Sequence, residues 1–117
     1  MARRGYIKMY RQIMDDDVWC DSDKFKLWSY CLMKACHKPQ NVLVGNRIVR
    51  LDKGQFITGR NDIEEEYNRN CKKEDYITGV TLFRWLKLFE KMDMISIDST
   101  NKYSVITVSN WDKYQNK

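Results

Sequence analysis

The stretch from Thr78 to Met92, TGVTLFRWLKLFEKM, constrains the fold of this chain more than any other. Its apolar side chains Leu82, Leu86 and Phe89 recur at the spacing of one face of an α-helix. Thr78 is placed to cap that helix, because its hydroxyl can accept a hydrogen bond from a free amide of the first turn. The sequence therefore predicts an amphipathic helix with one face buried in the core.

The opposite face of this helix begins with small residues and continues with cations. Its members are Gly79, Val80, Thr81, Arg84, Lys87 and Lys91. A small first turn followed by an arginine suits a helix that inserts its start into a DNA major groove. A core helix with a solvated basic face is the competing interpretation, and this stretch by itself favours it.

Composition indicates one folded domain of 117 residues, because 43% of them are hydrophobic and four Trp and seven Tyr argue against disorder. Lys and Arg number 21 against 16 acids, a net charge of +5 that permits nucleic-acid binding without establishing it. The charge is segregated, since residues 1–14 carry four cations and residues 15–23 carry five aspartates. Such blocks suit a DNA-binding face or self-association.

Catalytic and membrane signals are missing from the sequence. No secretory signal or membrane span is present, so we expect a cytoplasmic protein without a membrane partner. The four cysteines lack the paired spacing of a zinc site, and His37 is the single histidine. The run Asp15 to Asp17 reads as a solvated turn. We therefore expect no enzyme, no cofactor and no metal site.

Ahead of the central helix, the pattern predicts a first helix from about Lys24 to Cys36, capped by Ser22 or Asp23 and ending before Pro39. Its core face is predicted to consist of Phe25, Trp28, Cys31, Leu32 and Ala35.

Short strands and a further helix are expected next. The runs Val42 to Val44 and Arg47 to Leu51 flank Gly45-Asn46, which is typical of a two-residue hairpin. A very short strand is predicted at Gln55 to Thr58, followed by a helix from Thr58 or Asn61 to Tyr67.

Within that helix we expect Ile63 and Tyr67 to face inward and Glu64, Glu65 and Glu66 to face outward. Asn61 with Glu64 would form a variant capping box.

Beyond the central helix, alternating apolar residues at 95–98 and 105–108 flank a turn cluster at 99–102, which predicts a β-hairpin with one buried face. The whole order is that of a winged helix-turn-helix, with residues 94–109 as the wing and 78–92 as the recognition helix. We expect a single α+β domain over residues 1–117, mostly helical, with a two- to three-stranded wing sheet, an extra small hairpin, and an N-terminal arm over about 1–23.

Several segments together resemble a known family. They are GYIKMYRQIMDD, FKLWSYCLMKACHK, KGQFITGR, the IT-x-x-T-x-x-RWLK-x-FEKMDMI segment and STNKYSVITVSNWDKYQ. The chain is similar over nearly its whole length to the N-terminal domain of phage replisome organisers (replication initiation proteins), which are related to the primosome protein DnaD. The resemblance implies a winged-helix domain that binds the replication origin or self-assembles there. It implies that the replicative helicase or its loader is contacted by parts outside these 117 residues.

Two functions from different classes follow. The first is recognition of double-stranded DNA by a homo-oligomer, with Gly79, Val80, Thr81 and Arg84 facing bases. Phosphate contacts would come from Arg60, Lys87 and Lys102, with Asn101 near the minor groove. The second is an oligomerisation or protein-interaction module of a primosome-like complex. The polar stretch at 68–77 is longer than the three- to four-residue turn of a tight helix-turn-helix, which would alter how the recognition helix docks.

Overall fold

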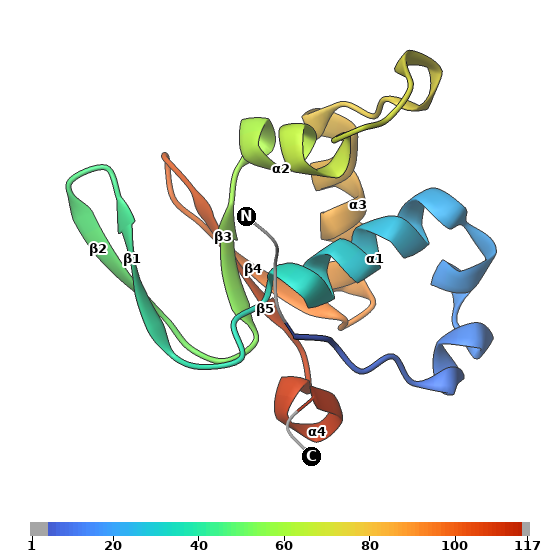
Figure 1. The fold of residues 1–117 in the computed structure, drawn as a ribbon, viewed down its shortest axis with the longest axis horizontal. Coiled ribbons are helices and arrows are strands. Elements are labelled where there is room, and N and C mark those ends of the chain that lie inside the picture. Colours follow the sequence, from blue (N-terminus) through green and yellow to red (C-terminus); the bar gives the residue numbers. More distant parts are fainter. Residues whose placement is uncertain (1–4, 116–117) are drawn as a thin grey trace.

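A computed structural model describes residues 5–115 of the chain. In this range, four α-helices and two small antiparallel sheets form an α+β fold (Figure 1). The helices are α1 (Ser22–Lys34), α2 (Arg60–Tyr67), α3 (Gly79–Lys91) and α4 (Trp111–Gln115). The strands are β1 (Gln40–Val44), β2 (Arg47–Leu51), β3 (Gln55–Thr58), β4 (Ile95–Ser99) and β5 (Ser104–Val108). Short 3-10 helices lie at η1 (Arg11–Asp15), η2 (Asp17–Cys20) and η3 (Lys73–Asp75).

The larger sheet has the strand order β3-β5-β4, so β5 is the central strand. Phe56 of β3 and Ile97 of β4 both pair with Ile106 of β5. Phe56 and Ile106 are buried, which places the core against this face of the sheet. The very short strand predicted at Gln55 to Thr58 is present as β3 and pairs with β5 of the C-terminal hairpin. The arrangement is compatible with a winged-helix-like fold.

Helix α3 agrees with its sequence prediction. The hydroxyl of Thr78 accepts a hydrogen bond from the Thr81 amide at 3.4 Å, as expected for the N-cap. Leu82, Leu86 and Phe89 are fully buried. Burying one such side chain stabilises the folded state by about 1.5–3 kcal/mol, so this stripe is a main contribution to the packing of α3 against the core.

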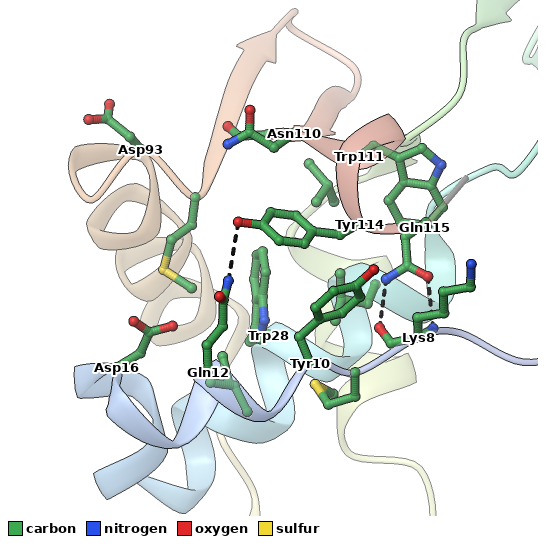
Figure 2. A pocket seen from close by; sticks show the side chains of 16 residues that line it. Lys8, Tyr10, Gln12, Asp16, Trp28, Asp93, Asn110, Trp111, Tyr114 and Gln115 are labelled. Carbon is green, nitrogen blue, oxygen red and sulfur yellow. Dashed lines mark hydrogen bonds between the residues drawn. The ribbon is translucent and has the colours of Figure 1, made fainter. Parts of the chain in front are cut away.

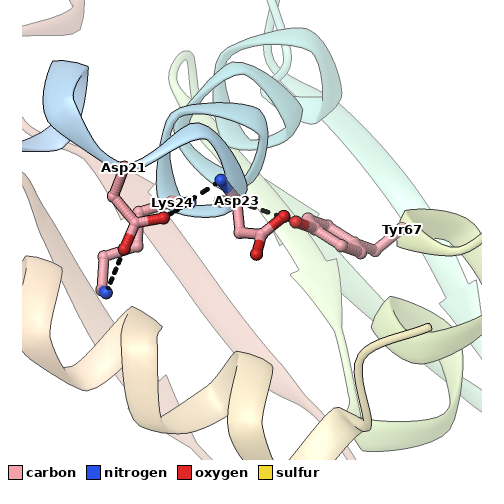
Figure 3. A network of polar contacts seen from close by, with 4 residues as sticks. All are labelled: Asp21, Asp23, Lys24 and Tyr67. Atoms are coloured by element: carbon pink, nitrogen blue, oxygen red, sulfur yellow. Dashed lines mark hydrogen bonds and ion pairs between the residues drawn. The ribbon is translucent and has the colours of Figure 1, made fainter. Parts of the chain in front are cut away.

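Helix α1 begins earlier than predicted, and its cap is Asp21 rather than Ser22 or Asp23 (Figure 3). The Asp21 carboxylate accepts from the amides of Asp23 and Lys24 at 3.1 and 3.2 Å. It also pairs with the Lys24 ammonium at 2.7 Å, and these hydrogen bonds hold the pKa of Asp21 below its ordinary value. A carboxylate both satisfies the free amides and complements the helix dipole, which favours Asp21 over the Ser22 hydroxyl, whereas Asp23 already lies within the first turn of α1. The helix ends before Pro39, as predicted.

The buried face of α1 differs in part from the predicted stripe. Cys31, Leu32 and Ala35 are buried as expected, but Phe25 and Trp28 are only partly buried. Leu27, which the predicted stripe omits, is fully buried and packs in the centre of the core. The face of α1 that is buried in the core therefore includes Leu27, and Phe25 and Trp28 lie at its edges.

Helix α2 corrects two predictions. Its N-cap is Gly59, which has no side chain to offer, and Asn61 lies inside the first turn, so no capping box forms. Glu64 and Glu66 do not face solvent freely. Glu66 accepts from the Tyr30 hydroxyl at 2.8 Å and pairs with Lys34 at 2.9 Å, because α1 passes beside this helix.

The predicted hairpin of β1 and β2 is confirmed, with Val44 paired to Arg47 across the Gly45-Asn46 turn. It extends away from the rest of the molecule (Figure 1). Leu43 and Ile48 face each other across this hairpin, and each is about 70% exposed.

The N-terminal segment packs against α4 around a cavity of about 290 Å³ (Figure 2). The Gln115 side chain accepts from the Lys8 amide at 2.8 Å and donates to the Lys8 carbonyl at 2.7 Å. Tyr10 and Tyr114 meet edge to face, with ring centroids 5.1 Å apart. Part of the predicted arm is therefore ordered structure, whereas Arg3 and Arg4 lie outside the described residues.

Candidate nucleic-acid interface

The long connection between α2 and α3 is closed at its base by the buried side chain of Asn68. The Asn68 amide donates to the carbonyls of Glu64 and Ile77, both at 2.7 Å. Its side-chain oxygen accepts from the Ile77 amide at 2.9 Å. The residues between Asn68 and Ile77 form an excursion whose two ends are tied together. The length of this loop therefore does not separate α2 from α3.

The start of α3 lies directly against α2. The Gly79 amide donates to the Glu64 carboxylate at 2.5 Å, and the Tyr76 hydroxyl donates to the same carboxylate. These hydrogen bonds, that of Tyr76 first, hold the pKa of Glu64 below its ordinary value. A Cβ atom at Gly79 would lie 2.4 Å from the Arg60 carbonyl oxygen, so only glycine allows this approach.

The sequence prediction that Gly79 faces bases is therefore corrected by its position in the fold. The residue is buried at the crossing of α2 and α3, where its missing side chain serves packing.

A groove of about 650 Å³ runs between α3 and the β4–β5 hairpin, and we call it the basic groove. Its lining residues are Gly59, Arg60, Val80, Phe83, Arg84, Lys87, Ser99, Thr100, Asn101, Lys102, Tyr103 and Ser104. The structure thus brings together Arg60, Val80, Arg84, Lys87, Asn101 and Lys102 from the predicted site. Three separate segments of the chain contribute them: the start of α2, the exposed face of α3, and the hairpin turn.

The charge of the basic groove has one sign. Arg60, Arg84, Lys87 and Lys102 line it without any acidic side chain. Among residues 5–115, none of these four cations makes an ion pair, and all four are exposed. Cations gathered in a concave surface without counter-charges raise the local positive potential, which favours a polyanion.

The hairpin turn that closes the groove is organised by Thr100. Its amide donates to the Tyr103 carbonyl at 2.7 Å, and its hydroxyl accepts from the amides of Lys102 and Tyr103 at 3.2 and 3.1 Å. This arrangement fixes the backbone of the turn and leaves Asn101 and Lys102 exposed. The turn cluster at 99–102 was predicted from the sequence, but the structural role of Thr100 within it was not.

Besides Gly79, one residue of the predicted site lies outside the groove lining, and some lining residues were not predicted. Thr81 does not line the basic groove. Its hydroxyl is hydrogen-bonded to that of Thr78 at 3.2 Å. Phe83 and Tyr103 contribute aromatic surface on opposite walls. Phe83 does not fit the helical spacing of Leu82, Leu86 and Phe89. This departure from the spacing could have predicted that Phe83 lies outside the buried stripe.

Within residues 5–115, no group of three His, Cys, Asp or Glu side chains is placed to hold a metal ion. Among the helices of the same range, none has the length and apolar character needed to cross a bilayer.

Comparisons with known proteins add no assignment. Protein-family models, curated protein sequences and solved structures each gave no match to this chain.

Proposed function

We propose that this chain is the DNA-binding winged-helix domain of a phage-type replication initiation protein and recognises double-stranded origin DNA. In this proposal α2 and α3 form the helix-turn-helix, α3 is the recognition helix, and the β4–β5 hairpin is the wing. The basic groove is the observation that carries it, because four cations without counter-ions face the same concave surface. A duplex presents a regular array of phosphates that such a surface would neutralise.

The exposed face of α3 offers both base-reading and backbone-contacting groups. Val80 is 53% exposed at the first turn and would contact a thymine methyl group. Arg84 follows one turn later, where its planar guanidinium could match the two acceptors of guanine. Lys87, Arg60 and Lys102 would hold phosphates on either side and fix the register.

Closure of the α2–α3 loop by Asn68 supports this geometry. Since Ile77 is tied back to Asn68, the start of α3 has a fixed position beside α2 despite the long sequence between them. A fixed helix start is what docking into a groove requires, because only the first turns of a recognition helix reach base edges.

The test is binding measured by fluorescence anisotropy, first on fragments selected from the source genome and then on random duplex. Arg84→Ala should weaken binding to the selected site by roughly 1–3 kcal/mol and to random DNA by much less. Arg84→Lys should restore part of the affinity and little of the discrimination, since an ammonium lacks the planar fork. Lys113→Ala is the matched control, because this exposed cation belongs to α4, and α4 lies away from the tip of the β4–β5 hairpin (Figure 1).

Two outcomes would contradict different parts of the proposal. An equal proportional loss on both DNAs would make Arg84 a backbone contact rather than a base reader. Parental binding by the Arg84→Ala variant would mean that the basic groove is not the DNA surface.

Self-association is a second candidate function, and a different observation favours it. Leu43 and Ile48 form an exposed apolar pair on a hairpin that no other element covers in the described structure. An isolated two-stranded hairpin is marginally stable in water, so covering this pair in an oligomer would stabilise it. Sedimentation of the parent and of a Leu43→Ser, Ile48→Ser variant would decide, with concentration-dependent assembly of the parent alone as the expected result.

A further inference from the structure

We propose that Lys26 and Cys71 form an oxidative covalent cross-link that ties α1 to the α2–α3 loop. The Lys26 ammonium donates a hydrogen bond to the Cys71 sulfur, with an Nζ–Sγ distance of 3.2 Å. The two residues are 45 positions apart in the sequence, so the fold, not chain connectivity, brings them into contact. This inference is independent of the proposed DNA binding.

Both side chains are held in place by Tyr67. The Lys26 nitrogen lies 4.2 Å from the centroid of the Tyr67 ring, and the Cys71 sulfur lies 3.8 Å from the Tyr67 carbonyl oxygen. Tyr67 itself is 3% exposed, and its hydroxyl donates to the Asp23 carbonyl at 2.9 Å (Figure 3). A buried tyrosine anchored to α1 thus orients both reacting atoms. Holding two groups at contact distance removes much of the entropic barrier to a bond between them.

The other cysteines lack this arrangement. Cys31 is fully buried, and burial raises the pKa of its thiol far above the ordinary range. Burial also raises the pKa of Cys36, whose sulfur accepts from the Gln40 amide at 3.0 Å. Cys20 is exposed, but in the described structure no lysine nitrogen lies within hydrogen-bond distance of its sulfur. Among the four cysteines, Cys71 alone combines access to solvent with an amine in contact.

The reaction requires an oxidant, and dioxygen or a peroxide can supply it. The Lys26 ammonium first releases one proton to solvent. With dioxygen, the Cys71 thiol and the resulting neutral amine then give an S–O–N bridge and one water. The S–H bond, one N–H bond and the O–O bond break, and an S–O bond, an O–N bond and the two O–H bonds of water form. Sulfur and nitrogen each lose two electrons, and the four electrons reduce dioxygen, one oxygen atom entering the bridge and the other leaving as water. With peroxide, two equivalents replace dioxygen and three waters are released.

The bridge would restrain the loop that leads to α3. Cys71 lies in the excursion between Asn68 and Ile77, whereas Lys26 lies on α1. A covalent bond between them would fix this excursion to the helical core in addition to the hydrogen bonds of Asn68. Its formation should raise the melting temperature, because the cross-link removes freedom from the unfolded chain.

The experiment uses the full chain with Cys20→Ser, which prevents disulfides between exposed Cys20 residues of two molecules. After exposure to dilute hydrogen peroxide, peptide mapping should find the peptides of Lys26 and Cys71 joined, with a mass about 14 Da above the sum of the two. Treatment with dithiothreitol should separate the two peptides again. Lys26→Arg and Cys71→Ser should each abolish the joined peptides.

Lys26→Arg keeps the charge over the Tyr67 ring, so its folding should survive, and the melting temperature before oxidation verifies this. Lys24→Arg is the matched control, since Lys24 lies on the same helix but pairs with Asp21. Oxidation of Cys71 by about 16 or 32 Da with Lys26 unmodified would overturn the proposal. Persistence of the gain of about 14 Da in the folded Lys26→Arg variant would overturn it as well.

Discussion

Replacement of Asn68 by Ala probes the closure of the α2–α3 loop most directly. The substitution removes three hydrogen bonds, two to Ile77 and one to the carbonyl of Glu64. The Glu64 carbonyl keeps a partner, because it also accepts from the Asn68 backbone amide at 3.3 Å. The amide and carbonyl of Ile77 lose the Asn68 side chain, which is their partner in the fold.

At about 1 kcal/mol for each hydrogen bond lost, and more where a backbone group stays unsatisfied, we expect a loss of roughly 2–4 kcal/mol in the free energy of unfolding. Urea denaturation followed by tryptophan fluorescence measures it, and the slope against urea should stay unchanged if only the native state is affected. Asn61→Ala is the matched control, because Asn61 is exposed on α2, and it should stay within about 0.5 kcal/mol of the parent. An Asn68→Ala variant as stable as this control would show that the loop is held by other contacts.

Four further outcomes are expected. Gly79→Ala should destabilise the fold by roughly 1–3 kcal/mol, since its Cβ would collide with the Arg60 carbonyl, and an unchanged urea midpoint would refute this close approach. Phe89→Ala should cost about 3–5 kcal/mol through the cavity it leaves, measured by the same denaturation, and a parental value would mean that α3 buries another face. The lowered pKa of Glu64 contributes stability above its ordinary value of 4.5, and this is lost as pH falls through the folded pKa. A Glu64→Gln variant should lack that part of the acid dependence in melting curves between pH 6 and 3, and identical profiles would rule out the contribution. Lys102→Ala should lower the slope of log affinity against log salt by about one unit, and an unchanged slope would remove the hairpin turn from the DNA interface.

Elements with a strong hydrophobic period were predictable from the sequence. The Leu82, Leu86 and Phe89 stripe gave the buried face of α3, and alternation around Ile106 gave the C-terminal hairpin. Local polar chemistry was harder to predict, because several side chains compete for the same free amides. Asp21 caps α1 although Ser22 and Asp23 stand beside it.

The exposed cations of the candidate site were predictable from the sequence, but the residues that join α2 to α3 were not. Arg84 and Lys87 of the basic groove were identified because the apolar stripe defines the opposite face of α3, and Lys102 because it lies in the turn of the predicted hairpin. Gly79 was assigned to that exposed face, yet it is buried where α2 crosses α3. The sequence also gave no indication of the role of Asn68. An asparagine in a polar loop looks the same in sequence whether it is solvated or hydrogen-bonds two backbone segments. Both depend on contacts between helices, which a single-sequence pattern does not contain.

The position of β5 at the centre of its sheet has a consequence for how the chain folds during synthesis. The hydrogen bond between Gln55 and Thr107 joins residues 52 positions apart, so β3 has no sheet partner until the C-terminal hairpin has been made. Helices α1, α2 and α3 emerge from the ribosome before β5, but the apolar side chains that meet β5 stay uncovered until it arrives. Long-range pairing of this kind slows folding, because a large loop must close before the contact stabilises it. Nascent chains that stop short of Val108 should therefore remain open to chaperones and proteases, and protection should appear abruptly once β5 has left the exit tunnel.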